Sequence, residues 1–163
     1  MRHNLLLAFL LTALCHRTLE GQVIVDQVDD WTYVESTDAF TDEVSGFLMT
    51  SGQDEGSLTL ACEGDVLGVL YGLGGYMGGD RDDRVRVRYR IDDTPASAQV
   101  AWILSRSGET AYGPEAVGIS FKVQAPRGTR VLFEAVDPLD GERRVHEFSL
   151  VGLDAMRRHL PCL

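Results

Sequence analysis

Polar and apolar side chains alternate strictly between residues 84 and 91. In order, the chain reads Arg84, Val85, Arg86, Val87, Arg88, Tyr89, Arg90 and Ile91. Successive side chains of a β-strand point to opposite faces, whereas a helix would scatter the four arginines around its circumference. The pattern therefore predicts a strand of an antiparallel sheet, with its apolar face on a core and its arginine face toward water.

Similar short apolar segments recur along the chain and are separated by turn residues. They cover residues 31–34, 44–50, 57–62, 66–71, 99–104, 110–112, 129–136 and 144–151, and residues 23–28 are either a strand or an N-terminal arm. Residues 153–160 have the pattern of a short amphipathic helix that ends before Pro161. Many short strands at regular spacing are typical of sandwiches and barrels. We therefore predict an all-β fold, an antiparallel β-sandwich or partly open barrel with a short C-terminal helix, as a single domain over residues 22–163.

Residues 116–125 fit two periodicities. Val117, Ile119, Phe121 and Val123 alternate as they would in a strand. Val117, Phe121 and Ala125 are also spaced four residues apart, as on one face of a helix. The sequence leaves both structures open for this segment.

The glycine-rich run over residues 72–80 invites comparison with phosphate-binding loops. A dinucleotide-binding loop would need glycine where Met77 stands, and a P-loop would need lysine where Asp80 stands. Asp80, Asp82 and Asp83 do not have the spacing of a calcium-binding loop. We therefore interpret the run as a flexible, bulged connection. The sequence predicts neither a cofactor nor a metal ion for this protein.

The first 21 residues have the pattern of a secretory signal peptide. Arg2 gives a positive start, and the stretch 5–14 that follows is largely apolar. This stretch is too short to span a bilayer, which needs about 20 apolar residues. Cleavage is predicted after Cys15 or Gly21, and a lipid anchor at Cys15 is disfavoured because the large Leu14 precedes it. We therefore predict export to the periplasm, with no transmembrane segment after cleavage.

Charge and cysteine content narrow the possible partners and the compartment. The chain has 15 Lys and Arg against 25 Asp and Glu, a formal net charge of −10, which makes nucleic acid an unexpected partner. Beyond the predicted cleavage sites, the remaining cysteines are Cys62 and Cys162. Two cysteines in an exported domain predict one disulfide, with two free buried thiols as the alternative. Two distant cysteines and two distant histidines do not suffice for a metal site.

The arginine-bearing face of residues 84–91 has two interpretations. In the first, the arginines form cross-strand ion pairs with some of the abundant carboxylates. In the second, Arg86 and Arg88 bind an anionic partner through bidentate contacts. The possible binding face comprises Arg84, Arg86, Arg88 and Arg90.

Aromatic and histidine side chains indicate a core rather than an active site. Trp31, Tyr89 and Trp102 lie within apolar strand patterns and are predicted core residues. His146 lies on a predicted strand, where we expect an exposed or hydrogen-bonded side chain, and His159 lies near a helix end, where a favourable dipole contact is expected. The chain has no Gly-x-Ser-x-Gly nucleophile elbow. We therefore expect a non-enzymatic function.

Several of these features, taken in order, resemble one known family. They are Trp31, the acidic turn 41–43, the strand that ends at Cys62, the run 76–80, the segment 88–92, Trp102 with Ser105, and residues 148–153 followed by Cys162. This ordered set resembles the VasI/TagO family, small periplasmic proteins associated with bacterial type VI secretion. The resemblance covers residues 31–162 and implies a periplasmic accessory domain with no assigned chemistry. Our leading hypothesis is an interaction module that binds a cell-envelope protein. The alternative from the residues themselves is a periplasmic binder of an anionic glycan, muropeptide or other small ligand that uses Trp31, Trp102 and the arginines.

Overall fold

The computed structural model describes residues 22–163 and shows one antiparallel sheet of ten strands in the order β1-β2-β3-β4-β5-β8-β7-β6-β9-β10. The predicted signal peptide, with its cleavage sites at Cys15 and Gly21, lies outside the described residues. The strands are β1 Gln22–Val28, β2 Trp31–Thr37, β3 Val44–Ser51, β4 Ser57–Glu63, β5 Val66–Gly72, β6 Arg84–Ile91, β7 Val100–Leu104, β8 Thr110–Tyr112, β9 Arg130–Val136 and β10 Arg143–Ser149. The predicted antiparallel all-β fold is confirmed.

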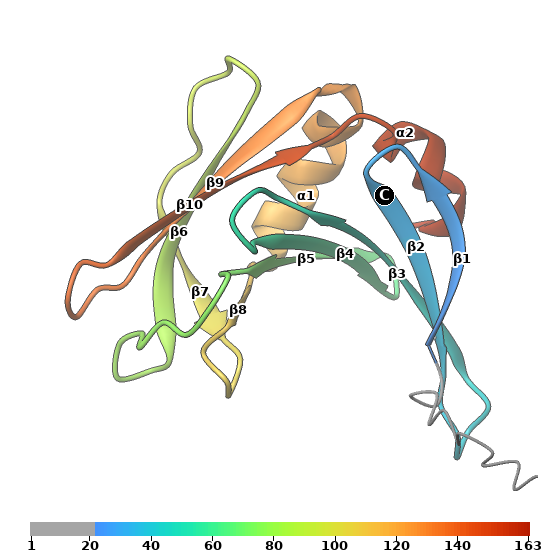
Figure 1. The fold of residues 1–163 in the computed structure, drawn as a ribbon, viewed down its shortest axis with the longest axis horizontal. Helices are drawn as coiled ribbons and strands as arrows, with labels where there is room; N and C mark the ends of the chain where they lie inside the picture. The colour runs from blue at the N-terminus through green and yellow to red at the C-terminus, as the bar shows by residue number, and fades with distance from the viewer. Residues whose placement is uncertain (1–21) are drawn as a thin grey trace, which may run out of the picture.

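The sheet curves so that its two halves face each other across the core (Figure 1). Tyr71 of β5 packs against Phe133 of β9 and Phe148 of β10, with ring centroids 5.1 and 6.1 Å apart. The end strands β1 and β10 are not paired with each other. Near this opening, the indole N–H of Trp31 in β2 donates a hydrogen bond of 3.1 Å to the carbonyl oxygen of Ser149. The sheet is therefore open, and a side chain rather than a strand ladder bridges this part of the seam.

The segment with two possible periodicities forms a helix, α1 (Glu115–Gln124), which continues into a 3-10 turn, η1 (Ala125–Arg127). Val117, Phe121 and Ala125 are buried, whereas Ile119 and Val123 are exposed by 57% and 60%. The spacing of four residues thus decides the structure, because it places three apolar side chains on the face that meets the core. Figure 1 shows α1 inside the curve of the sheet.

The C-terminal segment returns to the core and is covalently tied to β4. The helix α2 (Leu153–Met156) and the 3-10 turn η2 (Arg157–His159) form where a short helix is predicted. Cys62 and Cys162, the predicted pair, are joined by a disulfide across a sequence separation of 100 residues. Leu160 and Leu163 on either side of Cys162 are buried. Within residues 22–163, the helices are all too short or too polar to cross a membrane.

The glycine-rich connection between β5 and β6 is held in place by side chains of the β9–β10 hairpin. The buried carboxylate of Asp137 accepts hydrogen bonds from two consecutive glycine N–H groups, at 3.0 and 3.1 Å. Arg144 donates to the carbonyl oxygens of Leu73 and Tyr76 at 3.0 and 2.7 Å. The sequence-based interpretation of a flexible connection is therefore corrected, because buried and part-buried hydrogen bonds fix this segment to β10 and the turn before it.

Candidate functional site

The strongest candidate site is the solvent-facing side of β6 and its neighbours. In β6, each arginine is exposed and each apolar side chain between them is buried, as the alternation predicts. Strand β6 pairs with β7 on one side and with β9 on the other, and β9 pairs with β10. The registers place further charged residues on the same face. We call this surface the outer arginine face, and on β6, β9 and β10 it comprises Arg84, Arg86, Arg88, Arg90, Arg130 and Arg143, together with Glu134 and Glu147.

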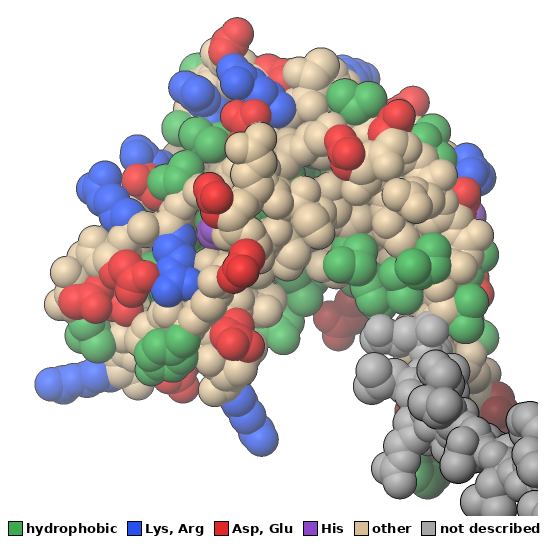
Figure 2. Space-filling view, viewed as in Figure 1, with side chains coloured by type: hydrophobic (Ala, Val, Ile, Leu, Met, Phe, Trp, Pro, Cys, Tyr) green, Lys and Arg blue, Asp and Glu red, His purple; other side chains and the backbone are tan. Residues whose placement is uncertain are grey.

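This face has an excess of positive charge on a chain whose formal net charge is −10. On the face shown in Figure 2, most Lys and Arg side chains lie over the half of the molecule that contains β6, β9 and β10, with Asp and Glu side chains interspersed among them. A concentrated patch of one sign on a protein of the opposite net charge attracts ligands or partners that complement the patch. The outer arginine face is therefore a candidate surface for an anionic partner.

Ion pairs organise part of the outer arginine face. Glu134 bridges Arg88 and Arg143, and its side chain is only 12% exposed. Arg130 lies between Glu147 and Asp93, at 3.4 Å from each carboxylate. The exposed Arg130 pairs contribute little stability, because solvent screens them. Glu134 is more enclosed and holds the Arg88 guanidinium in position.

The other three arginines of β6 form no ion pair with any carboxylate of residues 22–163. Their cross-strand neighbours are apolar: Ile103 faces Arg84, Ala101 and Val136 flank Arg86, and Leu132 faces Arg90. The interpretation of the whole row as cross-strand ion pairs is therefore wrong at three of four positions and correct at Arg88. The physical reason is the register, which places apolar side chains where the pairs would require carboxylates.

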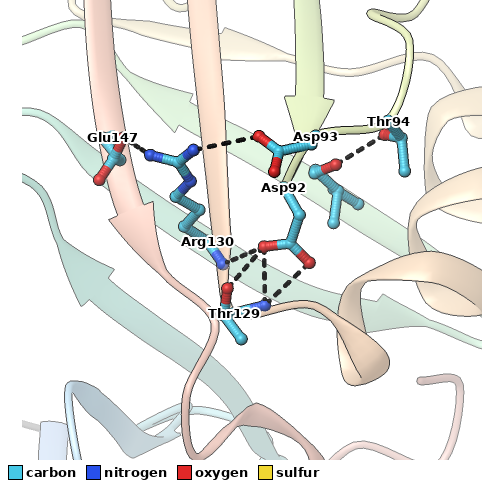
Figure 3. Close-up of polar contacts among 7 residues, drawn as sticks. Asp92, Asp93, Thr94, Thr129, Arg130 and Glu147 are labelled. Carbon is cyan, nitrogen blue, oxygen red and sulfur yellow. Dashed lines mark hydrogen bonds and ion pairs between the residues drawn. The ribbon is translucent and has the colours of Figure 1, made fainter.

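The turn after β6 fixes the alignment of β6 with β9. Figure 3 shows Asp92 pointing from the end of β6 toward the first residues of β9. Its carboxylate accepts hydrogen bonds from the Thr129 hydroxyl at 2.6 Å, the Thr129 N–H at 3.1 Å and the Arg130 N–H at 3.1 Å. The hydroxyl and backbone hydrogen bonds of Thr129 hold the pKa of Asp92 below its usual value. Asp92 thereby acts as a positioning residue for the outer arginine face.

A shallow groove of about 270 Å³ lies on this face, between β6, β9 and the segment after Asp92. It is lined by Arg88, Tyr89, Arg90, Ala96, Leu132, Glu134 and Val145. Leu132 and Val145 give it an aliphatic floor, and Val145 is 49% exposed. The rim carries the paired Arg88 and the unpaired Arg90. The groove therefore combines an apolar surface with a guanidinium group that no described carboxylate neutralises.

The two histidines lie away from this face. His146 is buried in β10, and its Nδ1 lies 2.6 Å from the Tyr71 hydroxyl. Burial lowers the pKa of His146 and raises that of Tyr71 well above its usual range. His159 stacks on Tyr33 with centroids 4.3 Å apart, and its Nε2 lies 2.8 Å from a carboxylate oxygen of Asp26. His146 is thus of the predicted hydrogen-bonded kind. His159 lies in the last turn of η2, near a helix end as predicted, and makes these side-chain contacts in addition.

The comparisons with known proteins add no family assignment. The chain finds no match among protein-family profiles, curated proteins or solved structures. Within the part of the chain that the structure describes, no group of three or more His, Cys, Asp or Glu side chains is arranged to hold a metal ion. The resemblance to the VasI/TagO family stays a prediction.

Sequence reasoning identified the arginines of β6 but not the residues that complete the site. Arg130, Leu132, Glu134, Arg143 and Val145 come from β9 and β10. The signal that could have found them is a second alternation, over residues 130–136, whose buried positions are Val131, Phe133 and Ala135. That alternation predicts which residues of β9 face outward, but it does not predict that β9 pairs with β6.

Proposed function

We propose that this protein is a non-enzymatic accessory domain of the bacterial cell envelope that binds an acidic partner protein through the outer arginine face. The observation that carries the proposal is a row of three arginines, Arg84, Arg86 and Arg90, that have no ion-pair partner among residues 22–163, on a chain with a net charge of −10. Arginine forks form two parallel hydrogen bonds with a carboxylate, so such a row favours acidic side chains. The predicted signal peptide and the Cys62–Cys162 disulfide support an oxidising, exported location.

The association with type VI secretion belongs to the same proposal and rests on the VasI/TagO resemblance. That resemblance implies an accessory role, and the cell-envelope partner is our own hypothesis. The outer arginine face gives such a partner a defined docking surface with charge complementarity, which raises the rate of association and the specificity of binding.

The environment of the histidines supports a binding rather than a catalytic role. A general base must reach the proton that it abstracts. His146 is 7% exposed and its Nδ1 faces the fully buried Tyr71. The Nε2 atom of His159 contacts the carboxylate of Asp26, and the His159 ring stacks on Tyr33. Neither histidine lies beside a hydroxyl or thiol nucleophile that a substrate can approach.

The second candidate function is binding of an anionic glycan or muropeptide, and the structure supports it less well. This hypothesis places the ligand against Trp31, Trp102 and the arginines. Trp31 is 0% exposed and Trp102 is 1% exposed, so neither indole offers a surface to a sugar ring. The arginines remain available to either kind of ligand, and the experiment below separates the two.

The test uses the exported protein as bait for cross-linked capture from its own cell envelope. Captured proteins are identified by mass spectrometry, and binding of the purified partner is then measured at low and high salt. The test variant is Arg86→Gln with Arg90→Gln, because neither arginine forms an ion pair with a described residue. We expect the affinity of this variant for the purified partner to fall about tenfold or more. Binding by the parent protein should weaken as salt rises.

The matched control is Arg106→Gln with Arg127→Gln, two exposed arginines outside the outer arginine face. This control changes the net charge by the same amount and should keep full affinity. Equal affinity in both double variants and the parent would refute the proposal. Loss of affinity in both would show that overall charge, rather than this face, governs binding. Retention of anionic glycan without any acidic protein partner would establish the second candidate instead.

A further inference from the structure

The spacing of the arginines in β6 indicates what kind of acidic segment they fit. Side chains on one face of a strand repeat every second residue, at about 6.8 Å. Arg86 and Arg90, which have no described carboxylate partner, are therefore about 14 Å apart along the strand. An extended peptide has the same repeat, so carboxylates four residues apart in such a peptide can reach both guanidinium groups at once. A helix places residues four apart only about 6 Å along its axis, which is too short.

A partner side chain that faces Arg88, between Arg86 and Arg90, should be uncharged. Arg88 is already neutralised by Glu134, whose charge would repel a second carboxylate. Beside them lies the groove of about 270 Å³ with its floor of Leu132 and Val145. The groove has room for an aliphatic side chain from a bound partner.

We propose that the outer arginine face binds an extended acidic peptide with carboxylates at positions i and i+4 and an aliphatic side chain at i+2. The carboxylates pair with Arg86 and Arg90, and the aliphatic side chain enters the groove. This inference rests on the proposed function, since it names the segment by which the acidic partner is held. The occupant is a peptide rather than a sugar because the floor of the groove, Leu132 and Val145, is aliphatic and because the cations lie in one line with the repeat of a peptide backbone.

The test measures binding of fluorescently labelled synthetic peptides to the full exported protein by anisotropy. The first peptide contains Glu-Ser-Leu-Ser-Glu, the second contains the same residues with the two glutamates adjacent, and the third has serine in place of leucine. We expect the first peptide to bind about tenfold or more tightly than each of the others. Similar affinity for all three peptides would overturn the inference.

A protein variant tests the groove independently of charge. Ala96 lines the groove and is exposed, so Ala96→Leu fills the groove without changing the core. Ala98→Leu is the matched control, because Ala98 is also exposed but does not line the groove. We expect Ala96→Leu to lower the affinity for the first peptide about tenfold and to leave the affinity for the third peptide unchanged. Ala98→Leu should leave the affinity for both peptides unchanged.

The outcomes distinguish this inference from the proposed function. Equal effects of the two alanine variants would overturn the inference about the groove. If Arg86→Gln with Arg90→Gln still abolished partner binding in that case, the proposed function would stand without this peptide pattern. If that double variant bound the partner and the first peptide with the affinity of the parent, the proposed function and the inference about the peptide would both be refuted. Binding of polygalacturonate but of no acidic peptide would overturn the inference in favour of an anionic glycan.

Discussion

Gly118 lies where α1 packs closely against β5, and replacing it tests how the helix is packed. A Cβ atom added to Gly118 would lie 1.9 Å from the carbonyl oxygen of Leu67 in β5. Ordinary contacts begin at 3.4 Å, so the helix or the strand would have to move by about 1.5 Å. Both atoms belong to, or are fixed by, backbone, so no side-chain rotation can relieve the overlap.

The expected effect of Gly118→Ala is opposite to the usual effect of this substitution in a helix. Helix propensity alone favours alanine by about 1 kcal/mol. Overpacking in a well-packed core costs about 1–3 kcal/mol, and here the displaced helix also carries the buried Phe121. The difference between the two terms predicts that the free energy of unfolding falls by up to about 2 kcal/mol, measured by urea denaturation of the oxidised protein with circular dichroism. Ile119→Ala is the control on the exposed side of the same helix and should change stability by less than about 0.5 kcal/mol. A Gly118→Ala variant more stable than the parent would refute the packing argument.

Three further predictions follow from the core. Trp102→Ala should cost about 3–5 kcal/mol of unfolding free energy, and an unchanged melting temperature would contradict its burial. Reduction of the disulfide, or Cys62→Ser, should cost about 4–5 kcal/mol in the chain-entropy model; thiols that alkylate in denaturant without reductant would show that the bond is absent. His146 has a pKa below its ordinary 6.5 in the folded protein because of burial, so its contribution to stability is fully present above pH 6.5 and is lost as the pH falls through the lowered pKa. His146→Gln should flatten this part of the stability profile measured by denaturant titration.

The strand pattern was predictable wherever one face of a segment is buried and the other is solvated. In β6 the alternation of arginine and apolar residues is complete, so the local sequence suffices. Residues 115–124 differ because Ile119 and Val123 are apolar although they are exposed, which creates a false period of two. Tertiary packing of Val117 and Phe121 decides between the periods, and the sequence does not contain that information locally.

The candidate site was predictable in part, because its residues come from distant segments. The four arginines of β6 lie within one local pattern. Glu134, which holds Arg88, is 46 residues away in sequence, and β7, β8, α1 and η1 separate the two strands along the chain. The pairing of β6 with β9 depends on how the sheet curves and on anchors such as Asp92 with Thr129. Without that register, the unpaired state of Arg86 and Arg90 could not be derived.

The energetics of the arginine row favour a role in binding over a role in folding. Two guanidinium groups about 6.8 Å apart repel each other by about 0.6 kcal/mol in water. Only Arg88 of the β6 row gains a carboxylate within the described residues, although the chain has 25 acidic residues. A neutral residue such as threonine at the positions of Arg84, Arg86 and Arg90 would keep the strand pattern and remove the repulsion. Within residues 22–163 these three arginines form no ion pair, whereas a partner that supplies carboxylates would turn the repulsion into binding energy.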